Sequence, residues 1–288
     1  MTSDGRIAKR FASLRQQRRG GLVTFVTAGD PDLGTSMEIL RRLPAAGADL
    51  IELGVPFSDP MADGPPIQAS SQRALRSGQT VRRTFGMVAA FRQGDPETPI
   101  VLMGYFNPIY SYGVRAFVAD AKQAGVDGLI VVDLPPEEAH ELYVPAAALG
   151  LDLIFLAAPT TDEARLPRVL EYARGFLYYV SITGVTGMQS AQVSRVASAV
   201  DKIRRQTDLP IAVGFGIRTP EQAAEMAGLA DAAVVGSALV DTVAGHLDAE
   251  GNPTPGLADH VIELVTSLGS GVRALATRRD AGGREARG

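Results

Sequence analysis

The chain has 288 residues, 45% hydrophobic and 21% charged, which is enough for one sizeable hydrophobic core. Its 28 Lys and Arg against 32 Asp and Glu give a formal charge of −4, and without a basic block in its body nucleic acid is not an expected partner. The absence of cysteine excludes disulfides, thiolate metal sites and cysteine nucleophiles, and suits a reducing compartment.

The first 17 residues predict an amphipathic helix, with Ile7, Phe11 and Leu14 on one face. This segment lacks the long apolar run of a signal peptide. No apolar segment of the chain approaches the roughly 20 residues that cross a membrane. We therefore expect a cytoplasmic protein with no membrane association.

Eight short apolar runs follow, and helical patterns fill the spaces between them. The runs are near-continuously apolar, which is typical of strands buried on both faces. Several helical patterns end at a glycine just before the next run, a C-cap signal. The runs are Gly21–Gly29, Ala48–Pro56, Pro99–Asn107, Asp127–Pro135, Leu151–Pro159, Gly175–Gly184, Pro210–Ile217 and Ala232–Val240.

Eight βα units in one chain predict an α/β fold, a single (β/α)8 TIM barrel over residues 1–276. It would carry an extra N-terminal helix and a short phosphate-binding helix after the eighth strand. A doubly wound open sheet is the alternative, because periodicity does not distinguish an open sheet from a closed one. The polar, Gly- and Arg-rich tail, residues 277–288, is expected to be disordered.

Glycine-bearing stretches follow the last three predicted strands, at Thr183–Gly187, Gly214–Ile217 and Gly236–Leu239. Glycine lets backbone N–H groups approach an anion closely, and a helix beginning near Ser237 would add unpaired donors and a favourable dipole. Each stretch alone is more simply a tight turn. Three of them at strand ends favour a phosphate site. Because the stretches contain no Lys or Arg, backbone dipoles would hold the anion.

Two common catalytic devices of such barrels, a Schiff-base lysine and a metal site, are not supported by the residues at the predicted strand ends. A Schiff-base lysine would lie near the end of a strand, but the lysines lie in helical patterns: Lys9, Lys122 and Lys202. A metal site would need clustered ligands, but three histidines lie apart in helical or loop stretches: His140, His246 and His260. Acid–base catalysis by carboxylates, without a metal, is what remains.

Glu52 and Asp63 are the candidate carboxylates. Alternation places Glu52 on the face opposite Ile51 and Leu53, in the lumen of a barrel. Burial there raises the pKa of a carboxyl group and makes it a proton donor and acceptor near neutral pH. The alternative for Glu52 is a buried ion pair with an arginine. The alternative for Asp63 is an N-terminal cap of the helix that follows it.

The stretch Glu52–Pro65 (ELGVPFSDPMADGP) closely resembles the signature of the tryptophan synthase alpha chain family. The resemblance extends over roughly residues 6–268. Five further stretches occur in family order: Thr24–Pro31, Val131–Glu138, Gly184–Gly187, Val213–Ile217 and Val234–Val240.

This resemblance implies a lyase of tryptophan biosynthesis that cleaves indole-3-glycerol phosphate to indole and glyceraldehyde 3-phosphate. No metal or cofactor is implied in this chain. Glu52 matches the acid that protonates C3 of the indole ring and can also accept the side-chain hydroxyl proton. Asp63 matches the carboxylate that binds the ring N–H and stabilises the developing charge.

Further site residues are implied by the same resemblance. Phe25 matches an aromatic of the indole pocket, although an ordinary core position is nearly as well supported. Tyr178 matches a tyrosine near the catalytic glutamate, and Thr186 a loop threonine that hydrogen-bonds the indole-binding aspartate. The phosphate-binding positions match Gly187, Gly216, Gly236 and Ser237.

The resemblance also implies a partner, a pyridoxal-phosphate-dependent beta chain in an alpha2-beta2 heterotetramer that receives the indole. Asp59 lies in the loop that faces this partner, and Asp133 matches an acid that connects the site to it. Ile182 stands where some members carry an arginine, so loop closure is expected to differ here.

Two rival functions remain open. The first is another phosphate-binding barrel enzyme, such as an isomerase or a decarboxylating indole-glycerol-phosphate synthase, but the synthase would need a lysine in the barrel. The second is a non-catalytic subunit that only activates a beta chain. The presence of both Glu52 and Asp63 argues against this.

Overall fold

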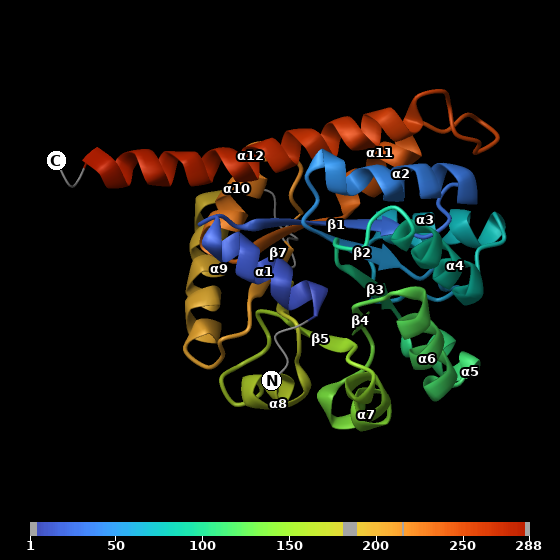
Figure 1. Cartoon of the computed structure of the whole chain (residues 1–288), viewed down its shortest axis with the longest axis horizontal. Coiled ribbons are helices and arrows are strands. Elements are labelled where there is room, and N and C mark those ends of the chain that lie inside the picture. The colour runs from blue at the N-terminus through green and yellow to red at the C-terminus, as the bar shows by residue number, and fades with distance from the viewer. Residues whose placement is uncertain (1–4, 181–188, 215, 286–288) are drawn as a thin grey trace.

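The computed structural model describes residues 5–180, 189–214 and 216–285, and within them parallel strands alternate with helices (Figure 1). The strands pair in chain order, and β1 also pairs with β8, which closes the barrel. The sequence prediction of a TIM barrel is therefore confirmed, and the open-sheet alternative is excluded. The strands are β1 (Gly21–Thr27), β2 (Leu50–Gly54), β3 (Ile100–Gly104), β4 (Gly128–Val131), β5 (Asp152–Ala157), β6 (Leu177–Val180), β7 (Ile211–Gly214) and β8 (Ala232–Val235).

The helices lie outside the barrel, apart from α1 at one end of it. Their bounds are α1 (Arg6–Gln16), α2 (Leu33–Ala46), α3 (Pro65–Arg76), α4 (Val81–Arg92), α5 (Phe106–Tyr112), α6 (Val114–Ala124), the 3₁₀ turn η1 (Pro136–Glu138), α7 (His140–Ala148), α8 (Leu166–Tyr172), α9 (Gln189–Arg204), α10 (Pro220–Leu229), α11 (Ser237–Gly245) and α12 (Leu257–Glu285).

Local sequence explains several of these boundaries. Thr219 is the N-cap of α10 and forms a capping box. Its side chain accepts from the Gln222 N–H, and the Gln222 side chain accepts from the Thr219 N–H. Gly47 and Gly125 end α2 and α6 in the left-handed conformation, which glycine adopts without strain. The predicted run Ala232–Val240 is divided at Gly236, where β8 gives way to the short helix α11.

Helix α1 closes the amino end of the barrel. Its buried residues Ile7, Phe11 and Leu14 belong to one cluster with lumen side chains from the strands, including Val23 and Leu50. Burying such side chains contributes about 2 kcal/mol each. Because this end is filled, an open site can lie only at the carboxyl ends of the strands, as in other barrels of this type.

Two of the buried arginine–aspartate pairs, those of Asp49 and Asp127, lie away from that open end. Asp49 accepts from Arg19 at 2.7 and 2.8 Å and from the Leu22 N–H at 3.0 Å. Asp127 accepts from Arg92 at 2.7 Å and from the Ile100 N–H at 2.8 Å. Each of these aspartates links the beginnings of two neighbouring strands. The arginines that bind them therefore stabilise the fold.

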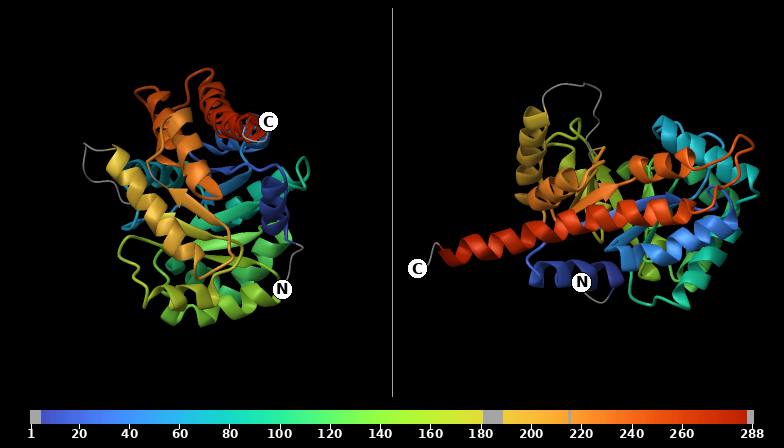
Figure 2. Two further views of the ribbon diagram at one scale, coloured as in Figure 1. Left: turned by 90° about the vertical axis from the view of Figure 1, so that its left-hand side faces the viewer. Right: turned by 90° about the horizontal axis from the view of Figure 1, so that it is seen from above.

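Helix α12 is longer than the sequence suggests, and its end projects past the barrel (Figure 2). Its backbone is helical to Glu285, through much of the segment for which the sequence predicts disorder. Extending an existing helix requires no new nucleus, and the Ala, Arg and Glu residues there have high helix propensity. None of the helices in the described part of the chain is long and apolar enough to cross a membrane.

Candidate active site

A cavity of about 170 Å³ lies at the carboxyl end of the barrel. Strands from both halves of the barrel and the loop after β2 contribute to its wall. It is lined by Phe25, Glu52, Asp63, Ile67, Met103, Tyr178, Val180, Gly214, Gly216, Ile217, Val234, Gly236 and Ser237. The structure thus brings the two predicted acids and the glycine-bearing ends of β7 and β8 into one cavity.

Glu52 lies in the middle of β2, in register with Phe25 of β1 and Val101 of β3. It is fully buried, and neither carboxylate oxygen has a hydrogen-bond partner among the described residues. Burial raises the pKa of Glu52 to about 8, because the charged form loses its hydration without gaining a partner. The carboxyl group is therefore protonated at pH 7. Among the residues that the structure describes, Glu52 forms no ion pair, so the alternative of a buried pair with an arginine is not found.

Asp63 has a different environment. It follows the loop after β2, is half-buried, and accepts a hydrogen bond from the Tyr105 hydroxyl to Oδ2 at 3.0 Å. Burial raises the pKa of Asp63, and the Tyr105 hydrogen bond lowers it. The capping alternative is wrong, because Gly64 is the N-cap of α3 and no side chain caps this helix. Asp63 therefore does not cap α3 and lines the cavity instead.

The contrast between these two acids suits two different tasks. In the described part of the chain no donor stabilises the charged form of Glu52, whereas Asp63 has one. The site therefore favours the charged form of Asp63 more than that of Glu52. Among the described residues, no group of three or more His, Asp and Glu side chains could hold a metal ion.

Phe25 and Tyr178 are aromatic walls of the cavity, and glycines make room for both. A Cβ atom on Gly54 would lie 2.6 Å from the Phe25 ring. A Cβ atom on Gly214 would lie 2.5 Å from the Tyr178 hydroxyl. Burial, followed by the charges of Glu52 and Asp63, raises the pKa of Tyr178. The Tyr178 phenol is therefore neutral. Phe25 is both a buried core residue and part of the cavity wall.

The glycine end of the cavity has the features of an anion site. Gly216 has a φ of 59°, a left-handed conformation that favours glycine. Gly236 is the N-cap of α11, and no side chain among the residues that the structure describes caps the first N–H groups of this helix. Such groups, with the helix dipole, attract a phosphate. Thr186, Gly187 and Ile182 lie outside the described residues, so their roles stay predictions.

Asp59 and Asp133 do not line this cavity. Asp59 is exposed in the loop after β2, and its Oδ2 accepts from the Ser58 hydroxyl at 2.5 Å. Asp133 is exposed beyond the end of β4, and its Oδ1 accepts from the Phe106 N–H at 2.8 Å. Both acids are therefore exposed residues outside the lining of the cavity.

Tyr105, the residue that contacts Asp63, was not predicted as a site residue from the sequence. The available signal was its place near the end of the predicted strand Pro99–Asn107, since strand ends carry the site in this fold. The apolar wall residues Ile67 and Met103 were not predicted either, because they carry no distinguishing sequence pattern.

Comparisons with known proteins show the family to which this chain belongs. The family model "Tryptophan synthase alpha chain" matches residues 11–264. Over 268 residues the chain is 59% identical to the tryptophan synthase alpha chain of Gluconacetobacter diazotrophicus, covering 93% of this chain and 98% of that one. The crystal structure of tryptophan synthase subunit alpha from Legionella pneumophila str. Paris gives a TM-score of 0.85 at 38% identity, over 93% and 98% of the two chains. A structure of Mycobacterium tuberculosis tryptophan synthase gives 0.82 at 38%, also over 93% and 98%. The chain belongs to the tryptophan synthase alpha chain family.

Proposed function

We propose that Glu52 and Asp63 carry out the reaction of this family, the lyase cleavage of indole-3-glycerol phosphate to indole and glyceraldehyde 3-phosphate. The observation that carries this assignment is the environment of Glu52, which is fully buried, has no hydrogen-bond partner in the described part of the chain, and has a pKa of about 8. A carboxyl group of this kind can give up a proton and take one back at neutral pH.

The reaction needs only one shuttled proton. Glu52 donates its proton to C3 of the indole ring, and the ring becomes a cation. The Asp63 carboxylate accepts a hydrogen bond from the ring N–H and stabilises this charge. The Glu52 carboxylate then removes the proton of the hydroxyl next to the ring. The carbon–carbon bond breaks, its electrons restore the neutral indole, the carbonyl of glyceraldehyde 3-phosphate forms, and Glu52 is protonated again.

The rest of the cavity orients the substrate for these steps. Phe25 and Tyr178 line the part that would hold the ring. Gly216, Gly236 and Ser237, with Gly187, would hold the phosphate through backbone N–H groups and one hydroxyl. Fixing both ends of the substrate places C3 beside Glu52 and contributes to the rate through proximity. Thr186 would close over the site and hydrogen-bond Asp63.

We assign the rim around the cavity to the partner, a beta chain that binds pyridoxal phosphate and forms an alpha2-beta2 heterotetramer with this chain. Two large apolar side chains are exposed there, Met61 at 87% and Tyr110 at 65%, which favours a protein contact. Met61 lies in the same loop as Asp59, and Tyr110 lies on α5, whose first N–H is bound by Asp133. Docking would deliver indole directly to the next enzyme.

Release of indole from indole-3-glycerol phosphate tests this assignment. The isolated chain is expected to release indole slowly, and addition of a beta chain to raise the rate about tenfold or more, because docking completes a site that depends on loop closure. Both rates are measured as indole formed over time. A chain that forms no indole under either condition would be a non-catalytic subunit or a different barrel enzyme. Full activity without the partner would contradict coupled closure.

A further inference from the structure

Tyr105 makes two hydrogen bonds to the segment that carries Asp63. It follows β3, is only 4% exposed, and its hydroxyl donates to Asp63 Oδ2 at 3.0 Å. The same hydroxyl accepts the N–H of Ala62 at 3.0 Å. One oxygen atom therefore holds both the carboxylate and the main chain directly before it. We propose that Tyr105 is the positioning residue for Asp63, which fixes this carboxylate over the cavity for the indole N–H.

Tyr105 can serve as a fixed point because its own backbone is held by the neighbouring strands. The Gly104 carbonyl accepts the N–H of Val132 at 3.0 Å. The Phe106 N–H donates to Asp133 at 2.8 Å. The first bond continues the β3–β4 backbone pairing past the strand ends. The second is made by the Asp133 side chain, so the aspartate beyond β4 also stabilises the main chain next to Tyr105.

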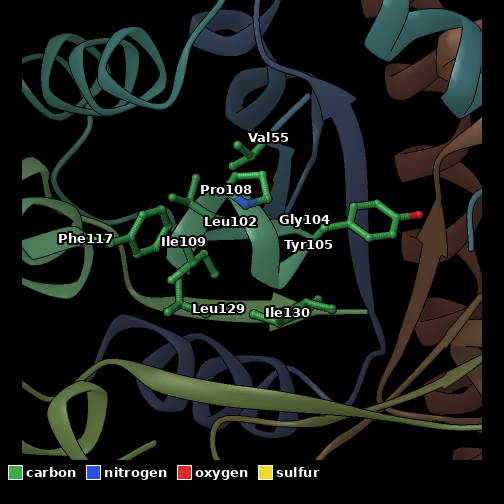
Figure 3. Close-up of a pocket in the computed structure, with 10 residues that line it drawn as sticks. Val55, Leu102, Gly104, Tyr105, Pro108, Ile109, Phe117, Leu129 and Ile130 are labelled. Carbon is green, nitrogen blue, oxygen red and sulfur yellow. The ribbon is translucent and has the colours of Figure 1, made fainter. Parts of the chain in front are cut away.

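The base of the Tyr105 side chain borders an apolar cluster. Val55, Leu102 and Phe117 line a void of about 10 Å³ there, about the space of one water molecule. Figure 3 shows the Tyr105 ring leaving this cluster, with its hydroxyl directed away from the other labelled residues. The ring of Phe57, from the loop after β2, lies 5.4 Å from the Tyr105 ring. The orientation of the hydroxyl is thus set by packing.

The loop that carries Asp63 has little else to hold the carboxylate. The Asp63 N–H donates to the Pro60 carbonyl at 3.1 Å, and the Asp63 carbonyl accepts from Gln68 at 2.8 Å. Both bonds involve the main chain of Asp63. Among the described residues, Tyr105 is the donor to its carboxylate. With Oδ2 held in this way, Oδ1 is left as the acceptor for the indole N–H.

This contact also favours the ionised form of Asp63. Burial raises the pKa of Asp63, and the hydrogen bond from Tyr105 opposes that rise because it stabilises the anion. The other titratable groups of this cavity are Glu52, which is neutral at pH 7, and Tyr178, whose pKa is raised. Loss of the Tyr105 hydroxyl therefore moves the pKa of Asp63 upward, and more of the carboxylate is protonated and inactive at a given acidic pH.

The inference rests on the proposed role of Asp63 and is tested by a double-mutant cycle of Tyr105→Phe and Asp63→Asn, each assayed for indole release with the beta chain. Tyr105→Phe keeps the packed ring and removes the hydroxyl. We expect it to lower kcat about tenfold, the scale of one lost hydrogen bond to a charged group, with a smaller change in KM. The acid limb of the kcat/KM profile should move to higher pH. In the Asp63→Asn background, Tyr105→Phe should lower kcat by less than about twofold.

Tyr143→Phe is the matched control, because its hydroxyl accepts from exposed Arg174, outside the cavity, and it should leave kcat unchanged. A Tyr105→Phe variant with wild-type kcat and an unmoved acid limb would overturn the inference. So would a full tenfold loss that persists in the Asp63→Asn background. If Asp63→Asn alone turned over like the wild type, the proposed role of Asp63 would itself be wrong, and the cycle separates this outcome from a failure of Tyr105 alone.

Discussion

Replacement of Glu52 by Gln should lower kcat for indole release by about 10³-fold or more, while the affinity for a phosphate ligand stays within about twofold. General acid–base catalysis alone contributes about 10²–10⁴-fold, and here one carboxyl group both gives and regains the proton. Gln fills the same space in β2 but cannot transfer a proton. The phosphate end of the cavity is formed by other strands, so its binding should be unaffected. Steady-state indole release and titration with glyceraldehyde 3-phosphate measure the two quantities.

Glu225→Gln is the matched control for this change, because Glu225 is exposed on α10. It should behave as the wild type in both measurements. Normal turnover by the Glu52→Gln variant would show that the proton comes from another group, and the mechanism proposed here would be wrong. A loss of phosphate-ligand affinity equal to the loss of turnover would instead indicate a disturbed cavity.

Asp63→Asn should lower kcat about 10²-fold with a smaller effect on KM. Asn has nearly the size and shape of Asp, so the cavity keeps its form, although its one amide oxygen can take the place of only one of the two acceptor oxygens of Asp63. It lacks the negative charge that stabilises the ring cation, and loss of one such electrostatic contact costs about 10²–10³-fold in kcat. Because the cation exists only after C3 is protonated, the loss should fall on kcat rather than on binding. The measurement is kcat and KM for indole release at pH 7.

Asp201→Asn is the corresponding control, since Asp201 is exposed on α9. Its kcat and KM should equal those of the wild type. An Asp63→Asn variant with an unchanged kcat and a raised KM would mean that Asp63 only binds the substrate. That result would remove charge stabilisation from the mechanism and leave the role of Glu52 intact.

Much of this site could be predicted from local sequence. Alternation around Glu52 placed its side chain in the lumen, because successive side chains of a strand point to opposite faces. The glycines after β7 and β8 marked one end of the cavity for a similarly local reason, their freedom to form tight turns beside a helix N-terminus. Closure of the sheet was not determined by periodicity, since buried strands of open and closed sheets have the same apolar pattern.

The contacts that tune the site depend on distant pairs of residues. Tyr105 binds an aspartate 42 positions earlier in the chain, and no local pattern marks such a pair. Gly214 makes room for the Tyr178 hydroxyl, a requirement that exists only after β6 and β7 are side by side. The choice between an ion pair and an isolated acid at Glu52 was likewise open, because it depends on where arginines lie in the folded chain.

The proposed mechanism depends above all on the protonation state of Glu52. Its pKa of about 8, against 4.5 for an unperturbed glutamate, means that the folded protein holds a proton that the unfolded chain releases. The free energy of unfolding therefore falls as the pH rises from 4.5 towards 8. The fold tolerates this cost at a position where an apolar residue would be more stable, as is typical of groups kept for catalysis.

Direct titration of Glu52 tests this claim. The carboxyl carbon of Glu52 can be followed by NMR in protein labelled with ¹³C at glutamate side chains, with the Glu52→Gln variant used to assign its signal. We expect a protonated carboxyl group at pH 7 and a midpoint near 8, with activity falling above that pH as the proton is lost. A signal already ionised at pH 7, with a midpoint near 4.5, would contradict the proposal that Glu52 is the proton donor.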